Sequence, residues 1–391
     1  MKRVLFFSLE DGWLGGVARV NCALQPALRE AGFQVDNLYL RGCRYPLPLK
    51  GNDYILRKNC PWEFITGRQI KEALRAKKPL SAIGLLLGRI WDEARGRLDF
   101  RQARRYIRAY KPDCIVVTSY LLLPAIPEEY LACTLHHVHT SLGATLAQKA
   151  NANMLRRFNG KIGFLWLSRG ICREAEKKGF QNCFYVYNPL SFYPEERTEA
   201  EEKRLISVIT RFSEEKRLPL AVSLLKRAMD QVPEKEFHVE FWGTGPEENA
   251  LRRAVAGDPR FALCGETREP YAHLLDSRLT VNTSAFEGFS ISILEAASAG
   301  VPAIAFHFGE AAEEEILDEK TGVLIPMDHN EEYVRALVRL LSDDDHVKAL
   351  SLGAREHASR FIPSRIAEDW EVLLSNLPLK APLPLDKKGN L

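Results

Sequence analysis

The sequence predicts an α/β fold built from two doubly wound domains, each with a parallel sheet between helices. Three observations lead to this prediction. Apolar runs of strand length alternate along the chain with segments whose apolar residues recur at helical spacing. The chain has 391 residues, which is too long for one ordinary core. A charged segment at 195–203 separates the two halves, and we interpret it as a linker without core residues.

The first half opens with a strand, a helix and a second strand. Residues 4–8 form an apolar run, residues 17–28 follow with helical spacing after Gly15 and Gly16, and a second strand is expected at 33–40. Later elements are expected to be strands at 113–118, 133–139, 162–168 and 183–187, and a helix at 169–178. We therefore expect a first domain at 1–190.

The second half repeats this alternation and predicts a domain at 204–362. Its expected strands are at 205–209, 236–241, 278–282, 303–306 and 323–326, and its expected helices at 292–299, 331–341 and 346–361. A last amphipathic helix, at about 363–377, is expected to pack back on the first domain. Residues 378–391 are rich in Pro and Lys, so we expect a mobile tail there.

Composition narrows the range of functions. Hydrophobic residues make up 46% of the chain and charged residues 27%, and the net charge is only +3, so no general affinity for nucleic acid is expected. The eight cysteines include no C-x-x-C pair and no Cys/His metal spacing, which indicates reduced thiols in a reducing compartment. No apolar run is long enough to span a bilayer. We expect a cytoplasmic protein.

One region departs from this balanced charge. Residues 68–111 hold thirteen Lys or Arg and four acids, an excess of nine positive charges. Such a segment could contact the anionic inner face of the cell membrane or receive a phosphate-rich acceptor. The alternative is a set of solvated helix faces around an ordinary core.

The stretch 281–306 carries the clearest chemical signal. Its pattern is a strand, a loop with Glu287 and Gly288, a helix from Ser292, and a second strand that follows Gly300. A helix that begins directly after such a loop offers free N–H groups to a phosphate. Glu287 and Glu295 flank that helix start, and beside a diphosphate they would accept hydrogen bonds from sugar or ribose hydroxyls. Alternatively, Ser292 and Glu295 form a capping box.

Residues 287–302, EGFSISILEAASAGVP, closely resemble the E-x7-E signature of family 4 glycosyltransferases, also described as glycosyl transferases group 1. The resemblance implies a GT-B fold, in which two Rossmann-like domains face each other across a cleft, and a retaining mechanism. It also implies that Glu295 holds the nucleotide ribose, and that Glu287 and the amides of Phe289, Ser290 and Ile291 hold the donor. Ser290 stands where the family often has Gly.

The same resemblance assigns further residues to the donor. Arg211 and Lys216 match an R-x4-K pair that binds the diphosphate, and Gly243 and Gly245 match a G-x-G-P turn in the nucleotide domain. Two cations at a strand end can also neutralise a departing pyrophosphate on physical grounds alone. The Gly15-Gly16 loop resembles the one that faces the donor diphosphate across the cleft. By itself, a pair of glycines is a weak signal.

Three histidines, His136, His137 and His139, lie at the end of the predicted strand 133–139. Alternate residues of a strand point to opposite faces, so three convergent metal ligands are not expected. The resemblance implies one histidine near this strand end that contacts the donor sugar or the acceptor. His139 is the first candidate and His136 the second, and a structural role is the alternative.

The sequence therefore predicts a retaining glycosyltransferase. It would transfer a hexose or N-acetylhexosamine from a nucleotide sugar, with a UDP-sugar as first choice, to a glycan, a lipid-linked acceptor or a cell-surface polymer. No cofactor or metal is expected, because Arg211, Lys216 and helix N-termini can supply the positive potential. The alternatives are a nucleotide-sugar epimerase of the same fold and a non-catalytic, membrane-associated binding protein.

Overall fold

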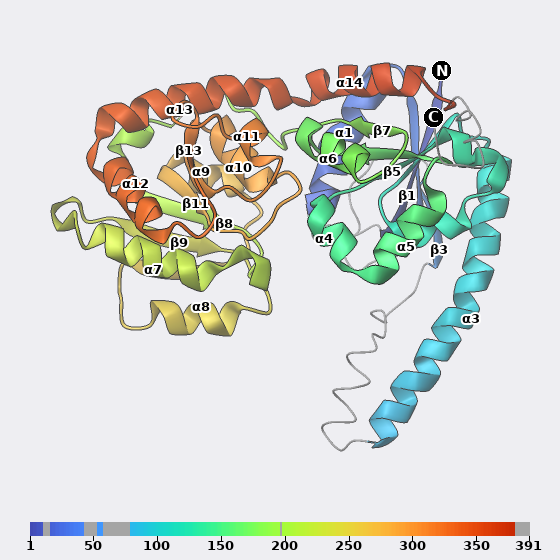
Figure 1. Cartoon of the computed structure of the whole chain (residues 1–391), viewed down its shortest axis with the longest axis horizontal. Helices are drawn as coiled ribbons and strands as arrows, with labels where there is room; N and C mark the ends of the chain where they lie inside the picture. The colour runs from blue at the N-terminus through green and yellow to red at the C-terminus, as the bar shows by residue number, and fades with distance from the viewer. Residues whose placement is uncertain (11–15, 43–52, 58–78, 196–197, 380–391) are drawn as a thin grey trace. The chain divides into compact units, whose positions relative to one another are not determined.

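The computed structural model describes residues 1–10, 16–42, 53–57, 79–195 and 198–379, without the side chains of 79–94 (Figure 1). The chain divides into two compact units. The first contains residues 1–137, 153–164 and 371–391, and the second contains residues 138–152 and 165–370. The predicted domain boundaries, 1–190 and 204–362, stay predictions.

The N-terminal sheet has seven strands in the order β3-β2-β1-β4-β5-β6-β7. Strand β1 pairs in parallel with β2 and β4, β2 with β3, and β4 with β5. The strands are β1 Arg3–Glu10, β2 Gln34–Arg41, β3 Asp53–Arg57, β4 Cys114–Val117, β5 Thr134–His137, β6 Gly163–Trp166 and β7 Cys183–Tyr185. The helices are α1 Gly16–Glu30, α3 Pro79–Tyr110, α4 Leu142–Ala147, α5 Lys149–Phe158 and α6 Arg169–Lys177.

The second unit contains an entirely parallel sheet of six strands in the order β10-β9-β8-β11-β12-β13. The strands are β8 Leu205–Ile209, β9 His238–Trp242, β10 Phe261–Gly265, β11 Ser277–Asn282, β12 Ala303–Phe306 and β13 Gly322–Ile325. The helices are α7 Leu218–Met229, α8 Glu248–Val255, α9 Pro270–Leu275, α10 Ile291–Ser298, α11 Ala312–Glu315, α12 Asn330–Ser342 and α13 Asp344–Ala358. Helices cover both faces: α7 and α12 pack into one core cluster, and α9 and α10 into another.

The segment predicted as a linker differs from that prediction. Thr198 and Ala200 are buried, and Ala200 belongs to the core of the second unit. The fully buried guanidinium of Arg278, on β11, donates to the carbonyl of Glu201 and, at 2.8 Å, to that of Leu340. The high charge of the segment gives no sign of burial in the sequence, because, of its described residues, only the small Ala200, between two glutamates, packs into the core.

The C-terminal helix α14, Pro363–Ser375, lies where the sequence predicts it. Its last turn belongs to the first unit, in which Lys2 donates to the carbonyl of Leu374 at 2.8 Å. Leu379, the second residue of the predicted tail 378–391, donates its N–H to the carbonyl of Ala132 at 2.8 Å, and 380–391 lie outside the described residues. Among the helices described, none combines the length and apolar character needed to cross a membrane.

Candidate active site

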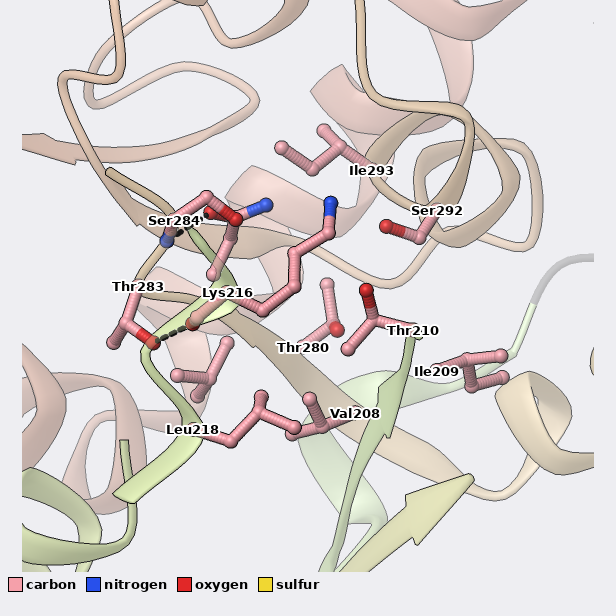
Figure 2. A pocket seen from close by; sticks show the side chains of 12 residues that line it. Val208, Ile209, Thr210, Lys216, Leu218, Thr280, Thr283, Ser284, Ser292 and Ile293 are labelled. Carbon is pink, nitrogen blue, oxygen red and sulfur yellow. Dashed lines mark hydrogen bonds between the residues drawn. The ribbon is translucent and has the colours of Figure 1, made fainter. Parts of the chain in front are cut away.

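The order in which the chain adds strands to the second sheet reverses between β8 and β11. Ligands of open α/β sheets bind at the carboxyl ends of the strands at such a point. Two loops leave these ends. One follows Ile209 and carries Arg211 and Lys216, and the other follows Asn282 and carries Glu287. A small pocket lies between them, lined by both strand ends, by Lys216 and by the first turn of α10 (Figure 2).

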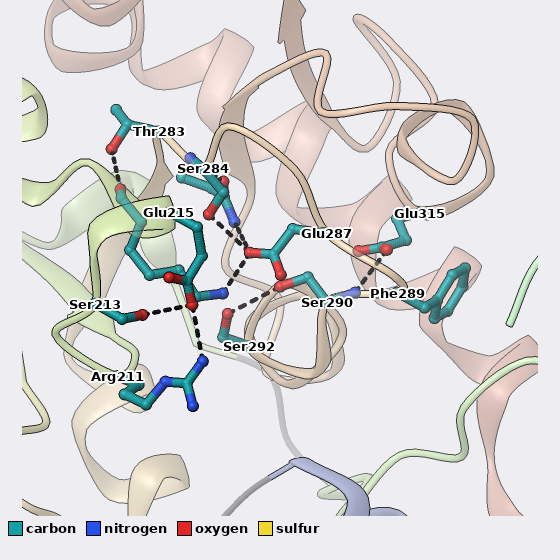
Figure 3. Close-up of polar contacts among 12 residues, drawn as sticks. Arg211, Ser213, Glu215, Thr283, Ser284, Glu287, Phe289, Ser290, Ser292 and Glu315 are labelled. Carbon is teal, nitrogen blue, oxygen red and sulfur yellow. Dashed lines mark hydrogen bonds and ion pairs between the residues drawn. The ribbon is translucent and has the colours of Figure 1, made fainter. Parts of the chain in front are cut away.

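Lys216 and Glu287 meet beside this pocket. The ammonium of Lys216 donates to Oε1 of Glu287 at 2.5 Å, and the hydroxyl of Ser284 donates to the same oxygen at 2.7 Å (Figure 3). Only 16% of the Lys216 side chain and 12% of the Glu287 side chain are exposed. A charge pair so far removed from water is held in a defined geometry.

Arg211 lies on the same loop but takes another partner. Its guanidinium donates to Glu215 at 2.8 Å, and 70% of the side chain is exposed. Burial raises the pKa of Glu215, but the hydrogen bonds from the Ser213 hydroxyl, its own backbone and Arg211 outweigh this and lower it. Arg211 is therefore a largely exposed charge paired with Glu215, whereas Lys216 is enclosed and paired with Glu287.

Helix α10 begins at Ile291, and Ser290 is its N-cap residue without a side-chain capping bond. The capping box considered from the sequence is therefore wrong, because Ser292 is the second helical residue. The N–H groups of Ile291 and Ser292 have no acceptor within the helix, since the first turn of any α-helix lacks preceding carbonyls. With Lys216 beside them, they form a site suited to a phosphate.

The loop 287–290 is held at nearly every residue. Asn188 Nδ2 donates to the carbonyl of Phe289 at 3.2 Å, and the N–H of Ser290 donates to Oε1 of Glu315 at 2.6 Å. These two bonds hold both ends of one peptide group. The Ser290 amide is therefore engaged by Glu315 in this structure, and its contact with a donor stays a prediction.

The other predicted residue of this loop, Phe289, contributes packing. Its ring is 5% exposed and lies 5.2 Å from the ring of Tyr187 and 5.6 Å from that of Phe361, measured between centroids. Gly288 permits a close approach, because a Cβ there would lie 3.0 Å from Cα of Thr140, within the same unit. The loop is therefore rigidly seated.

Glu295 and the glycines of the G-x-G-P turn are buried or tightly packed. Glu295 is 1% exposed, one turn into α10, and its contact with a ribose stays a prediction. A Cβ at Gly243 would lie 1.9 Å from the carbonyl oxygen of Thr210, and one at Gly245 would lie 2.2 Å from that of Phe212. These glycines let the turn after β9 pack on the loop that carries Arg211.

The two candidate histidines differ. His136 is 3% exposed, and its Nδ1 lies 3.0 Å from the carbonyl of Val117, so Nδ1 carries the proton. Burial lowers the pKa of His136 to about 4. This position favours the structural role that was the alternative, and a contact of His136 with a substrate stays a prediction. His139 lies two residues beyond β5, is half-buried, and its backbone carbonyl adjoins Gly288.

The Gly15-Gly16 loop is described only in part. Gly16 is the exposed first residue of α1, whereas Gly15 lies outside the described residues. Their contact with a diphosphate stays a prediction. In the described ranges, no group of three or more His, Cys, Asp or Glu side chains is arranged to hold a metal ion.

Several site residues escaped sequence reasoning. Asn282 ends strand β11 and Ser284 lies two residues beyond it, a position that could have marked both. Glu315 is the third of three consecutive glutamates, a run that reads as solvated, although its side chain is 1% exposed. Only its burial distinguishes it from Glu313 beside it, whose side chain is 79% exposed.

The chain is similar in sequence to known proteins that act on sugars or polysaccharides. The profile of a family described as "Glycosyl transferases group 1" matches residues 203–343, which include Lys216, Glu287 and Glu315. The chain is 24% identical over 338 residues to an exopolysaccharide phosphotransferase of Streptomyces coelicolor, and 25% identical over 179 residues to a poly(glycerol-phosphate) alpha-glucosyltransferase of Bacillus subtilis. These matches cover 80% and 45% of this chain. The chain spans only 34% and 26% of those two proteins.

A solved structure extends the comparison to the whole fold. Staphylococcus aureus TarM, crystallised as a variant with UDP, Fondaparinux and alpha-GlcNAc-glycerol, superimposes with a TM-score of 0.73 at 13% identity. The superposition covers 96% of this chain and 100% of that one. The chain therefore has the GT-B fold, with two parallel-sheet α/β domains, as the sequence predicts.

Proposed function

We propose that this chain is a glycosyltransferase that transfers a sugar from a nucleotide donor to a polymer or lipid-linked glycan of the cell envelope. The single observation that carries the proposal is the Lys216–Glu287 pair at the switch point of the second sheet. It lies within the span that matches the glycosyl transferase profile. The pair joins a cation suited to phosphate with an acid suited to hydroxyls, and a sugar diphosphate offers these two groups side by side.

The reaction requires stabilisation of the departing diphosphate. When the bond between sugar and phosphate breaks, negative charge grows on the phosphate oxygens. Lys216 and the free amides of Ile291 and Ser292 supply positive potential that is in place before the reaction begins. Arg211, exposed at the rim, can swing onto the diphosphate once a donor displaces its bond to Glu215. No metal is needed in this scheme.

The donor and the stereochemistry form the finer part of the proposal. A UDP-sugar is the first choice, supported by the TarM crystal structure, which contains UDP. We expect retention of configuration through attack on the face from which the diphosphate leaves. Glu287 is engaged by Lys216, Ser284 and, at 3.4 Å, Asn282, so it is suited to hold hydroxyls and not to act as a nucleophile. His139, beside Gly288, is the candidate contact to the sugar or acceptor.

Exposed arginines supply the acceptor part of the proposal. On α3, Arg97, Arg101 and Arg105 are exposed and recur at one-turn spacing, so they form a basic face. In the ranges described, no acid is recorded as pairing with these three side chains. A polyanionic acceptor fits this face, as the name poly(glycerol-phosphate) alpha-glucosyltransferase suggests for the B. subtilis relative. Contact of the wider segment 68–111 with the inner face of the membrane is the second possibility.

Turnover of nucleotide sugars by two variants tests the proposal. We expect Lys216→Ala to lower kcat/KM for the donor about 10²-fold or more, because a preorganised charge contact to the leaving group is lost. Arg211→Ala should act in the same direction without disturbing the fold, since its side chain is largely exposed. Arg252→Ala, which removes an exposed arginine of α8, is the matched control and should leave turnover unchanged.

Loss of less than about threefold in both variants would contradict the diphosphate role. Product analysis separates the alternatives. Net transfer to an acceptor identifies a transferase, whereas conversion of one nucleotide sugar into another without an acceptor identifies an epimerase. Binding of a nucleotide without either reaction identifies a silent binding protein.

A further inference from the structure

Behind the loop 287–290 lies an acid that the proposed mechanism does not use. Glu315 ends the short helix α11, and its side chain is 1% exposed. Oε1 accepts the N–H of Ser290 at 2.6 Å, while Oε2 is buried and has no hydrogen-bond partner among the described groups (Figure 3). A carboxylate in such a place would leave a charged oxygen without water or a donor, which is strongly unfavourable.

The groups around Glu315 shift its pKa in both directions, and burial has the largest effect. Burial raises its pKa well above the ordinary value, the bond from Ser290 opposes this, and the nearby Glu287 carboxylate raises the pKa further. Lys216 lowers it and Glu314 raises it to a smaller extent. Burial therefore favours the neutral carboxyl over the carboxylate, and in either form Oε1 can accept the Ser290 amide.

The contact matters because of what Ser290 joins. Its peptide group with Phe289 is held at the other end by Asn188. Glu287 lies two residues before Phe289, and the free amides of α10 follow directly after Ser290. Rotation of the Phe289–Ser290 peptide would move the Glu287 carboxylate, which is suited to accept hydrogen bonds from hydroxyls. It would also move the N–H groups of Ile291 and Ser292, which are suited to donate to a phosphate. Small displacements of groups that hold a reacting substrate are costly to the rate.

We propose that Glu315 is a positioning residue for the donor loop: through Ser290 it sets the orientation of Glu287 and of the first amides of α10. The inference rests on the proposed function for its kinetic consequence. That Glu315 and Asn188 hold the Phe289–Ser290 peptide in place does not depend on the proposed function, and it can be measured without turnover.

Replacement of Glu315 by two residues of similar size separates the roles. Glu315→Gln keeps a carbonyl oxygen for the Ser290 amide, so donor kcat/KM should stay within about threefold of the natural protein. Glu315→Leu keeps the volume but removes the acceptor, and we expect donor kcat/KM to fall at least tenfold while the acceptor KM is unchanged. Glu313→Leu, on the same helix but exposed, is the matched control and should behave as the natural protein.

Two outcomes overturn the proposal. One is a Glu315→Leu variant with unaltered donor kinetics, and the other is a Glu315→Gln variant as impaired as Glu315→Leu, which would mean that an anion is required. If Glu315→Leu does not fold, Ser290→Pro takes its place, because φ of Ser290 is −80° and proline removes the donated N–H. It should reproduce the donor defect, and normal donor kinetics in this variant would overturn the proposal.

Amide hydrogen exchange distinguishes a failure of this inference from a failure of the proposed function. Exchange of the Ser290 amide should be at least tenfold faster in the Leu variant, or in Asn188→Ala if that variant does not fold, and unchanged in Glu315→Gln. If no nucleotide sugar is turned over by the natural protein, the proposed function fails, yet faster exchange still supports positioning. Equal exchange in all variants overturns it.

Discussion

At the scale of single residues, burial decides what identical side chains do. Three consecutive glutamates of α11 have three different environments. Glu313 is exposed and contacts His307 at 3.3 Å, and Glu315 is buried against the loop 287–290. Between them, Glu314 accepts the N–H of Gly170 at 2.6 Å and the hydroxyl of Tyr187 at 2.6 Å, within the second unit. No local pattern in an acidic run distinguishes these environments, because they depend on which strands and loops lie opposite.

His136 provides a prediction at this scale. Its pKa is lowered by burial to about 4, so between about pH 4 and 6.5 the folded protein binds fewer protons than the unfolded chain. Stability is therefore fully present above pH 6.5 and falls as the pH is lowered toward 4, by up to about 3 kcal/mol. We expect chemical denaturation of His136→Gln to show a weaker loss over this range.

The exposed His329, replaced by Gln, is the control for that measurement, and its pH dependence should match that of the natural protein. An identical slope in His136→Gln and the natural protein would show that this ring does not control acid stability.

At the scale of elements, the site depends on how loops pack on one another. The turn after β9 and the loop after β8 approach so closely that two glycines are required. Gly243 has φ +143° and Gly245 has φ +156°, and a Cβ on either would meet a carbonyl oxygen of the facing loop. The resemblance to a G-x-G-P turn located these residues. Glycine is required at both positions because the backbone of this turn packs directly on the backbone of the loop that carries Arg211.

Gly243→Ala is therefore expected to destabilise the protein by more than about 2 kcal/mol, through both backbone strain and collision with Thr210. Gly257→Ala is the matched control: φ there is +78°, but nothing lies within 4 Å of the added Cβ, so only about 1 kcal/mol of strain is expected. Denaturant titration compares the two. Equal losses would mean that strain alone acts at Gly243.

Element boundaries followed the sequence closely in the second unit. Strands β8 and β12 begin and end where expected, and each end of helices α10 and α12 differs from the expected position by one residue. Strand β10 and helices α7, α8 and α9 were not predicted, nor were β3, α4 and α5. Strand β10 carries few fully buried residues, so its hydrophobic signal is weak.

At the scale of the whole molecule, we expect one unit to bind the donor and the other to bind the acceptor. The Lys216–Glu287 pair lies in the second unit, whereas the basic face of α3 lies in the first. Replacing Arg97, Arg101 and Arg105 together by Gln should raise KM for a polyanionic acceptor such as poly(glycerol phosphate) by about tenfold at low salt and leave the donor KM unchanged. The effect should shrink as added salt screens the charges.

A matched triple change on the second unit, Arg252, Arg253 and Arg335 to Gln, removes the same charge from other exposed positions. It should leave acceptor KM unchanged. If both triples raise KM equally, net charge and not the α3 face attracts the acceptor. Binding of the natural protein, but not the α3 triple, to anionic vesicles without polymer would favour the membrane as the ligand of this face.

By itself, the sequence determined the α/β class, the order of most strands, and the loop-to-helix segment that carries Glu287. These follow from periodicity, glycine positions and motif spacing, which act over a few residues. Only the tertiary structure decided that Lys216 pairs with Glu287 and Arg211 does not, that segment 198–203 is docked, and that Glu315 holds Ser290. The physical reason is that burial and pairing depend on residues far apart in the chain, and the sheet topology brings these together.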